Sequence, residues 1–114
     1  MELPELTKKQ VETLLTDFCR DRVPPHARNQ VRLVFTFDDA SVTLIEERVA
    51  YDDPSRWIQG PVAKFEFQTG DKTWCLYWQD RDLNWRPYEK LRPSRTFNHL
   101  LEEVKTDPTR VFWG

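Results

Sequence analysis

Between residues 31 and 79 the side chains alternate between apolar and polar with a period of two, and short turns interrupt the alternation. In VRLVFTF the apolar side chains recur at Val31, Leu33, Phe35 and Phe37. This period is typical of strands that bury one face. Turns as short as DDAS and GD join antiparallel neighbours. The pattern therefore predicts hairpins that follow one another in chain order.

Five strands are predicted, and they cover residues 31–37, 42–45, 62–69, 72–79 and 85–89. In the fourth strand Trp74, Leu76 and Trp78 share the apolar face, and the alternate side chains point the other way. Pro87 cannot donate a ladder hydrogen bond, so the fifth strand is predicted to lie at an edge. Residues 50–61, AYDDPSRWIQGP, contain two prolines and a glycine and predict a loop.

A first helix is predicted over residues 6–23, LTKKQVETLLTDFCRDRV, where apolar side chains recur at helical spacing. Thr7 followed by Gln10 has the form of a capping box, which places Leu6 and Val11 as the hydrophobic staple. These signals predict that the helix begins at about Thr7.

A second helix is predicted to follow Ser94, which is a fair cap, and to stop at Asp107-Pro108. Its apolar face carries Phe97, Leu100, Leu101 and Val104. The tail TRVFWG has two large aromatic side chains, which we expect to pack onto the body because exposing them is unfavourable.

A chain of 114 residues, of which 39% are hydrophobic, is predicted to form one domain over residues 1–114. The predicted fold class is α+β. An antiparallel five-stranded meander sheet is flanked by an N-terminal and a C-terminal helix, and the two helices supply the cover that its apolar face needs.

Charged side chains interrupt the apolar face of the second strand in EER. Parity places Glu46 and Arg48 on that face, where an ionised carboxylate is unfavourable unless it is paired. Two interpretations stay open: a partly exposed ion pair at the rim of the sheet, or a polar pocket at its end. A β-bulge would shift the parity and bring Glu47 inward instead.

Arginines cluster in RDRVPPHARNQVR (20–32) and again after residue 80. Arg28, Arg32 and Arg86 are candidate contacts for an anionic partner, since guanidinium groups match oxyanions. Arg32 and Arg86 would share one surface if the polar faces of the first and fifth strands coincide. The alternative is a solvated surface of mixed charge. Tyr77 and Tyr88 are the candidate exposed aromatic side chains.

Catalytic templates are absent from the sequence: it has no G-x-S-x-G, no P-loop and no H-E-x-x-H. Asp38, Glu46 and Glu66 could hold Mg²⁺ only if they converge, and parity puts Glu46 and Glu66 on opposite faces. Lys64 also precedes Glu66, the reverse of the E-x-K order of many nucleases. We therefore predict no catalytic residue, metal or cofactor.

The two cysteines, Cys19 and Cys75, form no C-x-x-C pair and no zinc spacing with the histidines. They are predicted to be free, buried thiols, which suits a reducing cytoplasm. The beginning MELPELTKKQ has no secretory pattern, and no apolar run approaches the roughly 20 residues of a membrane helix. A cytoplasmic location without membrane contact is expected.

Several stretches carry a family resemblance: VRLVF (31–35), SVTLIEER (41–48), VAKFEF (62–67), WCLYWQDRDLNWRPY (74–88) and LLEEVKTDPTRVFWG (100–114). Together they resemble a bacterial family known as domain of unknown function 3024. The positions that carry the likeness are Glu46, Arg48, Trp74, Tyr77, Trp78, Trp85, Tyr88 and Trp113. The resemblance implies a small cytoplasmic bacterial protein and brings no activity or cofactor.

The absence of catalytic templates, the aromatic-rich sheet and the clustered charge predict a non-enzymatic binding or adaptor domain. The net charge of −2 favours a protein partner over nucleic acid. The alternatives are a nucleic-acid-binding module that uses the arginine patches and a metal-dependent nucleic-acid hydrolase. The predicted binding residues are Arg28, Arg32, Glu46, Arg48, Tyr77, Arg86 and Tyr88.

Overall fold

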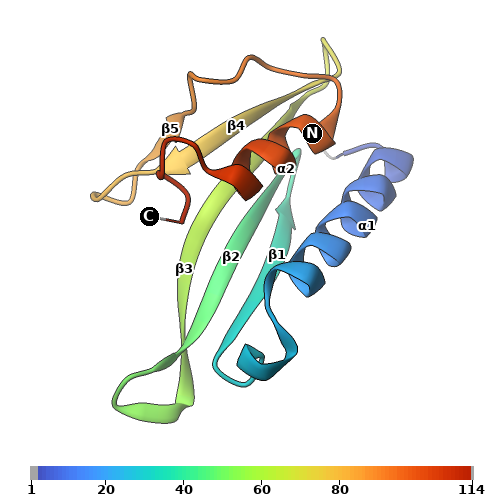
Figure 1. Cartoon of the computed structure of the whole chain (residues 1–114). Helices are drawn as coiled ribbons and strands as arrows, with labels where there is room; N and C mark the ends of the chain where they lie inside the picture. Colours follow the sequence, from blue (N-terminus) through green and yellow to red (C-terminus); the bar gives the residue numbers. More distant parts are fainter. Residues whose placement is uncertain (1–2, 114) are drawn as a thin grey trace.

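A five-stranded antiparallel sheet in the order β1-β2-β3-β4-β5 forms the body of the protein in the computed structural model, which describes residues 3–113 (Figure 1). In chain order the elements are α1 (Glu5–Arg22), a 3₁₀ turn (Pro25–Ala27), β1 (Val31–Asp38), β2 (Ser41–Ala50), β3 (Asp53–Gln68), β4 (Thr73–Gln79), β5 (Trp85–Pro87) and α2 (Phe97–Thr106). The predicted α+β class and the meander between two helices are confirmed.

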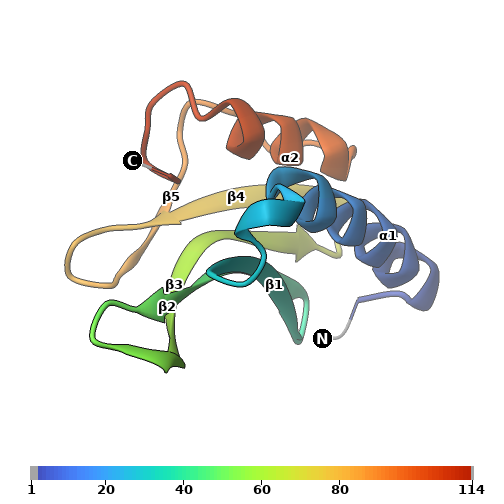
Figure 2. The ribbon, with the colours of Figure 1, turned by 60° about the horizontal axis from the view of Figure 1, so that its bottom comes forward.

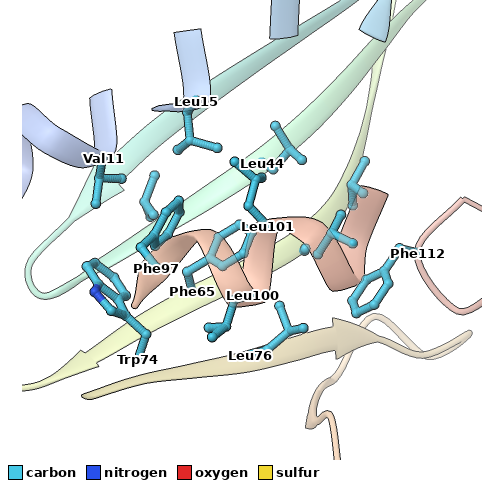
Figure 3. Packing of buried hydrophobic residues seen from close by; sticks show 14 of the residues in the cluster. Val11, Leu15, Leu44, Phe65, Trp74, Leu76, Phe97, Leu100, Leu101 and Phe112 are labelled. Atoms are coloured by element: carbon cyan, nitrogen blue, oxygen red, sulfur yellow. The ribbon is translucent and has the colours of Figure 1, made fainter. Parts of the chain in front are cut away.

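Both helices lie on the same face of the sheet, so the other face is left open (Figure 2). The core fills the space between the layers (Figure 3). Leu44 and Phe65 from the sheet meet Leu15 from α1 and Leu100 from α2, and each of the four is almost completely buried.

Aromatic rings form a chain through this core. Trp74 lies 5.0 Å from both Phe67 and Phe97, and Phe97 lies 4.8 Å from Phe65, between ring centroids. The predicted faces of β4 are confirmed, because Trp74 and Leu76 are buried whereas Tyr77 points to the open face.

The loop predicted over residues 50–61 is wrong, because β3 begins at Asp53 and pairs with β2 along most of this stretch. A register shift between Leu44 and Ile45 leaves Val62 as the extra residue of a bulge. Pro61 is tolerated because it faces Ile45, whose own hydrogen-bonding groups are directed to β1.

Both predicted helix caps are wrong. Helix α1 begins at Glu5 with Pro4 at the N-cap, and Leu6 is 70% exposed, so no staple forms. Helix α2 takes Thr96 as its N-cap without a side-chain hydrogen bond. Ser94 instead pairs with Trp74 in an isolated bridge to β4.

The C-terminal tail packs onto the body, as predicted, and Asp107 fixes it there. Asp107 ends α2 in the left-handed conformation (φ 45°), and its carboxylate accepts hydrogen bonds from the N–H groups of Phe112 and Trp113. The Trp113 Nε1–H donates to the Val104 carbonyl at 2.7 Å. Gly114, the last residue of the predicted tail, lies outside the described residues, as do Met1 and Glu2.

Candidate functional site: the groove between the helices

A hollow of about 760 Å³ lies between α1 and the start of α2, over the β3–β4 hairpin. A second hollow of about 540 Å³ continues along the same two helices. Leu14 and Asn98 line both hollows. The two hollows therefore form one groove, which we call the interhelical groove.

The wide end of the interhelical groove has an apolar floor. Val11, Trp74 and Phe97 are buried beneath it, and Leu14 and Phe67 are half-buried along its sides. Figure 3 shows Val11, Trp74 and Phe97 converging from α1, β4 and α2. Leu14 belongs to the apolar stripe of α1 but is only half-buried, so it offers apolar surface to the groove.

The wide end carries positive charge. Lys72 and Arg95 line it, both are exposed, and none of its lining residues is acidic. The N-terminus of α2 opens at the same place, and no side chain caps it. The helix dipole adds partial positive charge there. A segment with a negative charge is therefore favoured at the wide end.

The narrow end has mixed charge. Asp17, Asp21 and Glu102 line it together with Arg22 and Lys105. The two aspartates lie 3.3 and 3.1 Å from the Arg20 guanidinium, and these pairs are exposed. The two ends of the groove thus differ in charge, which would favour one direction of an elongated ligand.

The sequence did not identify the groove residues as a site. Lys72 and Arg95 stand in unrelated turns, and Leu14 has the spacing of an ordinary core position. The only available signal was the breadth of the apolar stripe on α1, which holds Val11, Leu14, Leu15 and Phe18.

Glu46 and Arg48 satisfy both predicted interpretations. The Arg48 Nε donates to Glu46 Oε1 at 2.7 Å in a partly exposed ion pair. The same two residues line a smaller hollow of about 270 Å³ with Arg22 and Trp113. Glu46 lies opposite Leu33 and stays on the covered face, because the bulge adds its residue to β3.

Glu47 is buried, but on the open face. Its two carboxylate oxygens accept hydrogen bonds from Arg32 Nε and Gln59 Nε2, each at 2.6 Å. The Gln59 bond and then the Arg32 bond lower the pKa of Glu47, against a smaller effect of burial. The Arg32 guanidinium also stacks 3.9 Å from the Trp57 ring. Arg32 is therefore held in a structural cluster with Glu47 and Trp57.

The arginines do not form one surface, so that hypothesis is wrong. Arg32 points to the open face of β1 at one end of the sheet. Arg86 faces Trp78 on the covered side of β5, at the opposite end, and its Nε donates to Asp80 Oδ2 at 2.7 Å. Arg28 donates to the backbone carbonyls of Val23 and Arg20, which fixes the turn after α1.

The two candidate tyrosines lie on opposite faces of the sheet. Tyr77 is half-buried on the open face and donates to Glu66 Oε1 at 3.3 Å. The predicted exposure of Tyr88 is wrong: it is 5% exposed and packs 5.0 Å from Phe112 of the tail. Burial and the hydrogen bond to Glu103 raise the pKa of Tyr88.

Asp38 and Glu66 both border Ser41 on the open face, whereas Glu46 lies on the covered face. Among residues 3–113 no group of three or more potential metal ligands is present. Cys19 and Cys75 are free thiols, as predicted, but they are half-buried rather than buried. Burial raises the pKa of Cys19 to about 11. Neither described helix has the length and apolar character to span a membrane.

The fold and the groove define a small α+β protein whose two helices lie apart on one face of a meander sheet. The chain belongs to the family described as Domain of unknown function (DUF3024), whose model matches residues 3–114. No curated protein and no solved structure matches this chain.

Proposed function

We propose that residues 1–114 act as one domain, a non-enzymatic adaptor that holds an apolar segment of a protein partner in the interhelical groove. The single observation that carries this proposal is the groove itself, which combines an apolar floor with a cationic wide end. Grooves between helices commonly accept an amphipathic segment through a few bulky anchors. A bulky side chain over Trp74 and Phe97, beside an acidic group near Lys72, would match this lining.

The proposed setting is the cytoplasm of a bacterial cell. Both cysteines are free, which fits a reducing compartment. A nucleic-acid role would need a continuous basic surface. The arginines Arg32 and Arg86 lie on opposite faces and are each held by a carboxylate, so we favour a protein partner.

Selection from a random peptide display library tests the proposal. We expect enrichment of peptides that combine bulky apolar side chains with an acidic residue, and anisotropy titration of a selected peptide gives its affinity. Leu14→Arg places a charged side chain in the middle of the groove and should weaken that affinity at least about tenfold. Loss of a central contact typically removes more than about 1.4 kcal/mol of binding free energy.

The matched control is Leu6→Arg. It makes the same substitution on the same helix at an exposed position that does not line the groove. It should leave peptide affinity and the melting temperature unchanged. Selected peptides that bind wild-type and Leu14→Arg protein equally, or a selection without enrichment, would overturn the groove proposal.

The cationic end has its own variant, Lys72→Glu with Arg95→Glu. Both side chains are exposed, so folding should be little affected. Affinity for peptides with the acidic residue should fall, and its dependence on salt should weaken. Unchanged salt dependence would remove the charge argument and leave only the apolar floor.

A further inference from the structure

The free edge of β1 differs from the other exposed edges of the sheet. β5 is only three residues long and contains Pro87. The part of β3 beyond the reach of β4 carries Pro61 beside Gly60 and a bulge. Short strands, prolines and bulges are the usual devices that prevent edge pairing. β1 has eight residues, no proline and a regular register with β2.

The hydrogen-bond pattern shows which groups this edge offers. The Val49 N–H donates to the Gln30 carbonyl, so Gln30 and Val49 form a hydrogen-bonded pair. Such pairs alternate along an antiparallel ladder. The N–H and C=O groups of Val31, Leu33, Phe35 and Phe37 are therefore directed outward. Within the described residues no hydrogen bond reaches these outward groups.

We propose that two copies of this chain associate by pairing their β1 edges antiparallel, with Arg32 of each copy opposite Asp38 of the other. In this register Phe35 faces Phe35 across the two-fold axis, and Leu33 faces Phe37. The apolar side chains thus meet on the covered face, and the opposite charges meet on the open face.

The chemistry of β1 selects this register over its neighbours. The outward N–H and C=O groups of one β1 must bond to the outward groups of the other β1. The nearest alternative registers therefore place the two-fold axis at Val34 or at Thr36. With the axis at Val34, Asp38 faces Gln30 and Arg32 faces Thr36. With the axis at Thr36, Asp38 faces Val34. Only the register centred on Phe35 pairs both charges, and it does so twice.

Arg32 and Asp38 can make this contact once the Arg32 guanidinium turns from its position over Trp57 towards the β1 edge. Both are exposed. The Arg32 bond to Glu47 comes from Nε, which leaves the terminal N–H groups of the guanidinium for a second carboxylate. The interhelical groove lies on the α2 side of α1, away from this edge, so pairing is independent of peptide binding.

Cysteine cross-linking tests the register directly. In the proposed pair Val34 faces Thr36 at a non-hydrogen-bonded position, where Cα atoms are about 4.5 Å apart, within the disulfide range. In a background with Cys19→Ala and Cys75→Ala, we would mix a Val34→Cys chain with a Thr36→Cys chain in a glutathione redox buffer. The mixed disulfide should dominate over both homodimeric disulfides.

The other outcomes overturn the proposal. Dominance of the Val34→Cys homodimer would place the axis at Val34, and dominance of the Thr36→Cys homodimer would place it at Thr36. Equal, random cross-linking would show collision without pairing. Sedimentation equilibrium of the wild-type protein that shows only monomer, from about 1 μM to about 1 mM, would exclude the pair altogether.

A charge reversal gives an independent measurement without cysteines. Asp38→Arg replaces two attractive cross-strand pairs by two repulsive ones, and should raise the dimer dissociation constant about tenfold. Asp71→Arg makes the same change in the exposed β3–β4 turn and should leave the constant unchanged. Equal constants for wild type and Asp38→Arg would contradict the register.

Discussion

The two faces of the sheet are built from the same strands but reach stability differently. On the covered face Val42, Leu44 and Phe65 lose all contact with solvent beneath the helices. On the open face, side chains such as Lys64 and Tyr77 stay half-exposed. Polar groups there are satisfied by neighbours in the same cross-strand row, as the Arg32–Glu47–Gln59 cluster shows.

This difference has one physical cause, which is cover. A buried apolar side chain contributes through the area removed from water, about 25 cal/mol per Å². A half-exposed polar pair exchanges bonds with water and contributes about 1 kcal/mol or less. The covered face should therefore dominate the free energy of unfolding, and the open face should tolerate change.

Two residues of β4 on opposite faces of the sheet, Trp74 and Tyr77, test the comparison most strongly. Trp74→Ala should destabilise the protein by about 3–5 kcal/mol, because it leaves a cavity in the aromatic chain. Tyr77→Ala, on the open face, should cost about 1–2 kcal/mol. Urea unfolding gives both values. Equal losses would mean that the two faces do not differ in energetic weight.

Glu47 tests whether the open face has a polar core of its own. Glu47→Gln should lower the free energy of unfolding by about 1–2 kcal/mol at pH 7. This is the lower range for hydrogen bonds to charged groups, because water reaches the half-exposed Arg32 side chain. Folding lowers the pKa of Glu47. Its stabilisation is therefore complete above the ordinary glutamate pKa of about 4.3 and is lost as the pH falls through the folded pKa.

The difference in unfolding free energy between wild type and Glu47→Gln should thus shrink as the pH is lowered from 7 to about 3. Chemical denaturation at several pH values measures it. A difference that stays constant over this range would show that the carboxylate charge is not what stabilises the cluster.

The rim of the covered face should behave like the open face. Arg48→Ala should change stability by only about 0–1 kcal/mol, because the Arg48–Glu46 pair is partly exposed to solvent. A double-mutant cycle with Glu46→Ala gives the coupling energy. A loss above about 2 kcal/mol would place this pair in the core instead.

Local sequence determined the hairpins and the two faces of most strands. The alternation from Val31 to Phe37 and the side-chain parity of Trp74, Leu76 and Tyr77 were predicted correctly. These features depend on residues a few positions apart, through backbone geometry and turn length. For the same reason the meander, the helix that precedes it in the chain and the helix that follows it could be predicted without tertiary information.

Only the tertiary structure decided the rest. The stretch 53–61 looks like a loop, but pairing with β2 makes it a strand, and Pro61 is tolerated because it opposes a residue that bonds to β1. Tyr88 is buried because Phe112, distant in sequence, folds back over it. The interhelical groove depends on the separation of α1 and α2. No local pattern encodes that distance, because it is set by how the side chains of both helices fill one shared core.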